Sequence, residues 1–470
     1  MGEVFNAVAS GSASLAAARI LTKVISFAAF YLITVTLSLA DYGLVTLALA
    51  VSGPALVVAG LGLDDLVAAN GARLIGEGKP NESASLLGGF ALVKISITGT
   101  ILLLLIFIKN FLGADYERVL DQFFLPLAIW IAVTALRTLA DLAIVMRQRF
   151  VWFAAANVAE AAGKLFVVIA LFVGHTLSVT TVIWAYVAGK TLSLLLTLPS
   201  LPWFLPRARA LGAVKDFFAA VRGRGKWEML RGFFGQLFSG VYNWITALLL
   251  GLEAVAVLNV AIAMNSLLQQ VLPFRQVIFP IISRLSATEG ASAFVARRLV
   301  KYSVWTNTLL ILLAVIFLPP AVRTYYPKYA SALPLFFFLS FSLYLNSLSL
   351  SHAPLLQSLG EQKLLLGLSL LGTISSVTVL PALIWLVGLP GVVAEQLLST
   401  GVIVWIRERR LRAAHRLPTF AWRDFVIFDD FDRALFGRLR TFNFAAVLGR
   451  GRASRGGDRE PPVGDQAERV

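Results

Sequence analysis

The chain has 470 residues, of which 58% are apolar and 14% are charged, and its formal net charge is +15. A mean hydropathy of +0.79 excludes an ordinary water-soluble domain and indicates that lipid surrounds most of the chain. The chain contains no cysteine, which excludes disulfides, thiol catalysis and cysteine metal sites.

Roughly a dozen apolar stretches are long enough to cross a bilayer as helices, which takes about 20 residues each. Their continuous apolar character favours helices over a barrel, whose strands would alternate over about ten residues. In chain order the expected spans are 13–39, 43–66, 85–108, 123–146, 150–174, 177–204, 229–250, 254–282, 300–320, 332–357, 363–387 and 389–406. We therefore expect an all-α polytopic membrane protein with about 12 transmembrane helices.

Lys and Arg are concentrated in alternate loops, above all in the linker 205–228. The opposite loops carry only Lys109, Arg118, Arg323 and Lys328. Because basic loops stay in the cytoplasm, both termini should be cytoplasmic and the chain should cross the cytoplasmic (inner) membrane an even number of times. The basic loops would contact the anionic inner leaflet, and a nucleic-acid partner is not expected. Residues 1–12 show no basic leader or cleavage pattern, so no removable signal peptide is expected.

Short sequence matches recur along the chain at an offset of 211 to 212 residues. Arg19 matches Arg231, Asp41 matches Glu253, and Arg73-Leu74 matches Arg284-Leu285. Such duplication predicts two halves, and six spans per half make the halves parallel. We expect two parallel six-helix bundles around a central cavity: residues 1–204 and 229–406, joined by the basic cytoplasmic linker 205–228. Residues 407–470 would form a cytoplasmic tail, disordered in its last part.

Ionisable residues within the spans are functional candidates, because a charge in lipid is costly unless it faces a cavity or a partner. The candidate cavity cations for an anionic substrate are Lys94, Lys190, Arg137, Lys164, Arg19, Lys23 and Arg275. Lys94 and Lys190 lie near mid-span without an opposite charge at helical spacing, so a phosphate or uronate would supply one. Arg19 and Lys23 also lack one, but in the first turns of the first helix they would more readily snorkel to the inner surface.

The candidate acids for binding a coupling proton or sodium ion are Asp64, Asp65, Asp141 and Glu160. Arg137 precedes Asp141 by four residues, and Glu160 precedes Lys164 by four, so each pair shares a helix face and can neutralise itself. These two pairs are therefore either internal ion pairs or ligands of the substrate or ion, and the spacing leaves both alternatives open.

Uncharged polar residues are concentrated in the second half, where they would either line a sugar path or join helices by hydrogen bonds. They are Asn243, Asn259, Asn265, Gln269, Gln270, Asn307 and Asn346. No phosphate loop, dinucleotide pattern or metal-ligand cluster occurs, so neither cofactor nor metal is expected. The energy would come from an ion gradient, the membrane potential or the substrate gradient.

Six short motifs lie between residues 10 and 406: Arg19 to Leu21, Asp41 to Leu44, Gly60 to Leu63, Glu253 to Ala261, Pro280 to Leu285 and Gln357 to Lys363. Together they resemble the polysaccharide transporter family of lipid-linked oligosaccharide flippases, in a superfamily that also holds multidrug and lipid II flippases. The resemblance implies a V-shaped pair of six-helix bundles with alternating access to a cavity. Cavity cations would then meet a charged glycan or the diphosphate of a polyprenyl carrier. The two extra C-terminal helices frequent in lipid II flippases are missing, which disfavours lipid II.

The leading hypothesis is a flippase that carries polyprenyl-diphosphate-linked oligosaccharide to the outer leaflet for surface polysaccharide or glycan assembly, with polysaccharide assembly proteins as further candidate partners. The alternative is an ion-coupled multidrug exporter of the same superfamily, whose cationic drugs would favour an acidic cavity. A membrane-embedded polysaccharide polymerase is disfavoured, because the longest predicted outer loop, 109–122, leaves no room for an external catalytic domain. We therefore expect no enzymatic activity.

Overall fold

The computed structural model describes residues 2–108, 114–147, 149–204, 211–222, 226–237, 241–270 and 291–415, with isolated positions between 420 and 433. The chain divides into two compact units, and the membrane helices belong to the unit Gly11–Ala421. Within the described ranges this unit is built of helices and contains no strand. The all-α prediction is therefore confirmed.

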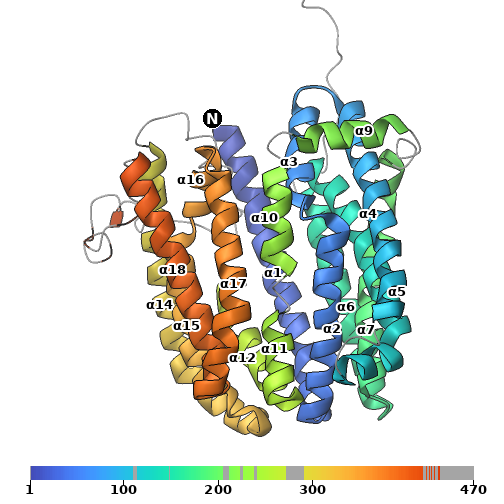
Figure 1. Ribbon diagram of the computed structural model, residues 1–470, viewed down its shortest axis with the longest axis vertical. Helices are drawn as coiled ribbons and strands as arrows, with labels where there is room; N and C mark the ends of the chain where they lie inside the picture. The colour runs from blue at the N-terminus through green and yellow to red at the C-terminus, as the bar shows by residue number, and fades with distance from the viewer. Residues whose placement is uncertain are drawn as a thin grey trace, which may run out of the picture. The chain divides into compact units, whose positions relative to one another are not determined.

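The first half contains seven helices, which are joined to the second half by two short elements (Figure 1). The seven are α1 (Gly2–Thr36), α2 (Leu39–Gly60), α3 (Asp64–Gly76), α4 (Pro80–Ile108), α5 (Ala114–Met146), α6 (Phe150–Val173) and α7 (Val179–Thr197). The connecting elements are η2 (Leu198–Trp203) and α9 (Leu211–Ala220).

The second half begins with two short helices and continues with longer ones. They are α10 (Lys226–Leu237), α11 (Val241–Leu250), α12 (Leu252–Gln270), α14 (Ala291–Tyr325), η5 (Pro327–Tyr329), α15 (Ala332–Ser349), α16 (His352–Ser358), α17 (Gln362–Val387) and α18 (Pro390–His415). Polar caps start some of the helices. Ser38, for example, accepts a hydrogen bond from the backbone N–H of Asp41 at the start of α2.

Ten of the described helices are long and apolar enough to cross a membrane. Two of the twelve expected spans are not among these ten, for identifiable reasons. The expected span 229–250 consists of the shorter helices α10 and α11. The last span, α18, is long enough, but its second half carries a run of charged residues that continues to His415. The sequence thus predicted these two helical regions, but it did not predict the break between α10 and α11 or the charged extension of α18 to His415.

The two halves meet along α2 and α12, which occupy equivalent places in the repeat and pack against each other. Each carries an acid in its first turn, Asp41 in α2 and Glu253 in α12. Gly43 allows the close approach, because a Cβ atom there would lie 2.1 Å from the carbonyl oxygen of Leu252. The apolar cluster around this seam takes buried residues from both halves, such as Val45 and Ala256.

Helix α9 forms within the basic linker and packs on α4, across which it runs in Figure 1. Its apolar side chains Ala213 and Phe217 are buried, and the ring of Phe217 lies 5.6 Å from that of Phe90. Phe218 remains half exposed on the other side of the helix. Helix α9 is thus amphipathic, and its apolar face is covered by protein.

Candidate functional site

A cavity of about 920 Å³ lies between the two halves and is lined by α1, α6, α7, α12, α14, α15, α16 and α18. Helices α1, α6 and α14 contribute positions at helical spacing, because only one face of a helix can point inward. From α1 these are Arg19, Thr22, Lys23 and Ser26. This polar stripe at i, i+3, i+4 and i+7 is visible in the sequence and was the available signal that α1 faces a cavity.

The cavity wall is strongly basic on the side of the first half. Arg19, Lys23, Lys164 and Lys190 line it, and Arg407 of α18 adds a fifth basic residue, against the single acid Glu160. Arg19 and Lys23 therefore face the cavity, and the expectation that they snorkel to the inner surface stays a prediction. The Lys164 ammonium lies 4.6 Å from the centre of the Tyr186 ring, a cation–π contact.

Glu160 pairs with Lys190 of α7, at 2.6 Å between Oε1 and Nζ. Of the two alternatives left open for Glu160 and Lys164, the internal pair on one helix does not form, because Glu160 pairs with Lys190 instead. The expectation that Lys190 lacks a partner is wrong. Helices α6 and α7 pack closely, so the cross-helix neighbour reaches the carboxylate. Among the described residues, Lys164 forms no ion pair and is left to the cavity.

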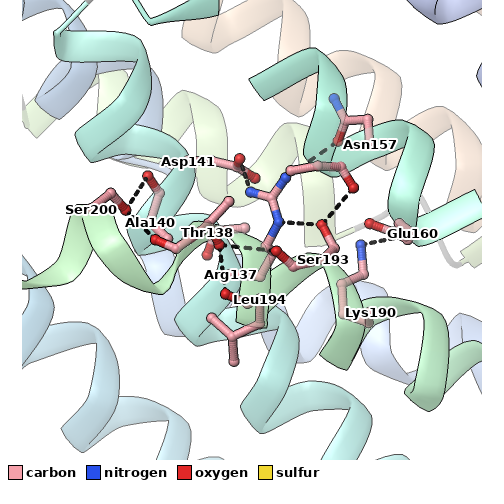
Figure 2. A network of polar contacts seen from close by, with 12 residues as sticks. Arg137, Thr138, Ala140, Asp141, Asn157, Glu160, Lys190, Ser193, Leu194 and Ser200 are labelled. Atoms are coloured by element: carbon pink, nitrogen blue, oxygen red, sulfur yellow. Dashed lines mark hydrogen bonds and ion pairs between the residues drawn. The ribbon is translucent and has the colours of Figure 1, made fainter. Parts of the chain in front are cut away.

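Arg137 lies behind the cavity wall in a network of its own (Figure 2). It is 2% exposed, pairs with Asp141 and donates a hydrogen bond from Nε to Ser193 at 2.6 Å. A longer contact of 3.5 Å reaches the amide oxygen of Asn157, which does line the cavity. The expected pair Arg137–Asp141 is present, and it connects α5 to α6 and α7.

Lys94 is also remote from the cavity lining. It is 1% exposed in α4 and forms an ion pair with Asp64 of α3, at 2.6 Å between Nζ and Oδ1. The expectation that Lys94 has no partner is wrong, because the partner comes from another helix, 30 residues away in sequence. Of the remaining candidates, Arg275 and the side chain of Asp65 lie outside the described residues.

The second half supplies neutral polar groups to the cavity. Gln269, Asn307 and Asn346 line it, and the Asn307 amide donates a 2.7 Å hydrogen bond to Ser347. By contrast, the Asn259 amide nitrogen donates to Asn243 at 2.9 Å within the second half. Hydrogen bonds between helices therefore occur among these amides, and three of the amides line the cavity, where a sugar path stays a prediction.

Further along α1 from the cavity, aromatic rings and one lysine join the two halves. The rings of Tyr31 and Tyr326 lie 5.0 Å apart with an edge-to-face geometry. Lys328 donates hydrogen bonds to the carbonyl oxygens of Val35 at 3.0 Å and Leu37 at 2.5 Å. A lysine from the second half thus satisfies free carbonyls at the C-terminal end of α1.

The charged C-terminal part of α18 contacts the start of α17, where Arg410 and His415 pair with Glu361. Burial raises the pKa of the Glu361 carboxyl, but hydrogen bonds from Arg410 and His415 outweigh this effect and hold the pKa below its ordinary value. The Arg410 Nε–Glu361 Oε1 distance is 2.9 Å. The last turns of α18 are therefore part of the packed structure.

Solved structures with the same arrangement of helices are membrane transporters. A lipid II flippase MurJ in an inward closed conformation has a TM-score of 0.69 at 12% identity, covering 88% of this chain and 89% of that chain. An inward-facing multidrug resistance MATE family transporter has a TM-score of 0.64 at 14% identity, covering 85% and 99%. A transporter from Pyrococcus furiosus has a TM-score of 0.61 at 12% identity, covering 85% and 93%. The titles of the last two place those proteins in the MOP superfamily.

The fold is therefore the one that these membrane transporters share. Residues 8–286 match the model of the family described as polysaccharide biosynthesis protein. This match spans more than half of the chain, and the chain belongs to that family. A search of curated protein sequences finds no match.

Proposed function

We propose that the protein is a flippase that moves a polyprenyl-diphosphate-linked oligosaccharide across the cytoplasmic membrane by alternating access. The observation that carries this proposal is the cavity of about 920 Å³, in which five basic residues face one acid. Its volume is at the upper end of the usual range for small-molecule sites. Family membership supports a role in polysaccharide biosynthesis.

The two walls of the cavity suit the two parts of such a substrate. Lys164, Lys23 and Arg19 offer charge-assisted hydrogen bonds to the diphosphate. The amides of Gln269, Asn307 and Asn346 on the facing wall suit sugar hydroxyls, because an amide both donates and accepts. A cationic drug would instead be repelled by the basic wall, which disfavours the multidrug alternative.

The orientation follows from the charge distribution. Basic loops are kept in the cytoplasm, and the candidate span of α1, Ala18–Thr36, lines the cavity near its N-terminal end, at Arg19 and Lys23. In our proposal the cavity opens to the cytoplasm, and the aromatic seam at Tyr31 and Tyr326 closes the outer side. Lys328 would have to release α1 when the outer side opens.

The proposal is tested in liposomes with a fluorescent short-chain polyprenyl diphosphate that carries an oligosaccharide. Lys164→Gln and Lys23→Gln should each slow flipping about tenfold or more, since a hydrogen bond to a charged group contributes roughly 1.5–3 kcal/mol. The matched control is Lys79→Gln, because Lys79 is exposed and far from the cavity lining, with only a surface pair to Glu82. Folded variants that flip at the control rate would refute the proposed site. Transport of a cationic dye by the wild-type protein, without flipping of the diphosphate lipid, would favour the drug exporter.

A further inference from the structure

A buried carboxyl group in the second half has a different environment from the acids considered above. Glu395 of α18 is fully buried, with 0% exposure. The Tyr242 hydroxyl of α11 donates to its Oε2 at 2.5 Å, and the Ser375 hydroxyl of α17 donates to its Oε1 at 2.6 Å. Ser376 donates to the Tyr242 oxygen at 3.2 Å. Three helices thus meet at one carboxyl group.

Three of the four acids that the sequence singled out for coupling pair with cations in the structure. Asp64 pairs with Lys94, Asp141 with Arg137, and Glu160 with Lys190. The side chain of the fourth, Asp65, lies outside the described residues. Within the described part of the chain, Glu395 forms no ion pair, and its hydrogen-bond partners are hydroxyl groups. The fully buried Glu395 is therefore an acid without a counter-charge there, and it was not among those four candidates.

Few other ionisable groups face this carboxyl from the helices packed around it. Tyr242 is the group from α11. Helix α17 carries one ionisable residue, Lys363, which is twelve residues from Ser375 and hence about 18 Å away along the helix. Helix α15 also packs on α18, and its one ionisable residue, Tyr344, lies in its last two turns, whereas Glu395 lies in the second turn of α18.

An ionised carboxylate buried without a cation costs several kcal/mol, and either a proton or a metal ion removes this cost. The distances leave no space for a metal ion between the carboxyl group and the two hydroxyls. Oxygen atoms 2.5 to 2.6 Å apart, as Glu395 is from Tyr242 and Ser375, are joined by the hydrogen atom of the donating hydroxyl, and a proton is therefore the species that we consider. A metal ion would need its own separation of about 2.3–2.6 Å from each oxygen, which would push the oxygens further apart.

We propose that Glu395 is a proton-binding residue, and that its proton exchange couples transport to the proton gradient. When ionised, the carboxylate accepts hydrogen bonds from both Tyr242 and Ser375. When protonated, it has a hydrogen of its own to donate, so one of the two hydroxyls must turn. This change alters the hydrogen bonds that join α11 and α17 to α18. Helix α11 also contacts α2 at the seam between the halves. The coupling part rests on the proposed flippase function, whereas proton binding does not.

Proton binding is tested without a glycan, by infrared difference spectroscopy of the reconstituted full chain during a pH change. The wild-type protein should show the carbonyl band of a buried carboxylic acid, and Glu395→Gln should lack it. Glu253→Gln is the matched control, because Glu253 is an exposed acid of the same half, and this variant should keep the band. Ser375→Ala keeps the acid but removes one hydrogen-bond donor, so it should keep the band at a shifted frequency. A band that persists in Glu395→Gln overturns the proposal, as does a band that sodium shifts at constant pH, which would indicate a metal ion.

Coupling is then measured with the fluorescent diphosphate lipid, with and without a pH gradient across the liposome membrane. Glu395→Gln should lose about tenfold of the gradient-driven rate, the usual scale of coupling between two sites, and should keep the rate without a gradient. An unchanged gradient response in this variant overturns the coupling. If wild-type protein flips no diphosphate lipid while the infrared band behaves as expected, the flippase function fails and the proton site stands.

Discussion

Replacing Arg137 by leucine tests whether the buried Arg137–Asp141 pair supports the fold or binds the substrate. The change leaves Asp141 charged with its partner gone, and breaking a buried pair in this way typically costs 3–5 kcal/mol. Asp141 keeps 23% side-chain exposure, so we expect the lower end, about 3 kcal/mol. Ser193 loses the hydrogen bond from Arg137 but keeps its own to the carbonyl oxygen of Ala156 at 2.8 Å.

The decisive comparison is the double variant Arg137→Leu with Asp141→Leu, measured by thermal unfolding in detergent and by flipping in liposomes. With both charges gone, no unpaired ion remains, and the double variant should recover to within about 1 kcal/mol of the wild type. It should also flip the lipid at nearly the wild-type rate, because neither residue is part of the cavity lining. A stable double variant that does not flip would show that Arg137 contacts substrate and would refute this reasoning.

Two other predictions concern the contacts between the halves. Gly43→Ala should lower thermal stability and slow flipping, because its Cβ would clash with the Leu252 carbonyl oxygen. The control Gly99→Ala should do neither, because no atom lies within 4 Å of its Cβ. Equal behaviour of the two variants in unfolding and flipping assays would contradict the packing argument. Lys328→Met removes two hydrogen bonds to the end of α1, so a cysteine introduced by Phe30→Cys in this cysteine-free chain should react several-fold faster with an impermeant thiol reagent. No change in that labelling rate would show that Lys328 does not hold this end closed.

The helical type and ten of the twelve expected spans could be predicted from the sequence, because each span needs an apolar run whose length the bilayer sets. The equivalence of the two halves was visible in marks such as Asp41 and Glu253, which the structure places in the first turns of α2 and α12. The interruption between α10 and α11 was missed, since hydropathy averages over a window and does not register a local break in the helix.

Ion pairs between residues far apart in the chain could not be predicted from the sequence. Spacing of four residues identified Arg137 with Asp141, because both lie on one helix face, but the same rule failed for Glu160, which meets Lys190 of the neighbouring helix. Lys94 likewise pairs with an acid on a neighbouring helix, Asp64. Such pairs depend on which helix faces pack together, and a single sequence contains no record of that choice.

The sequence by itself determined that this protein is helical, membrane-embedded and basic, because these properties depend on composition and periodicity along one chain. Only the tertiary structure decided which charges face the cavity. The packing of α6 on α7 pairs Lys190 with Glu160, and the packing of α3 on α4 pairs Lys94 with Asp64. The cavity cations Arg19, Lys23 and Lys164 have no ion-pair partner among the described residues. It also decided that Glu395 is the buried acid without a counter-charge there. The physical reason is the same in each case: in a medium without water, the partner of a charge is set by the neighbouring helix.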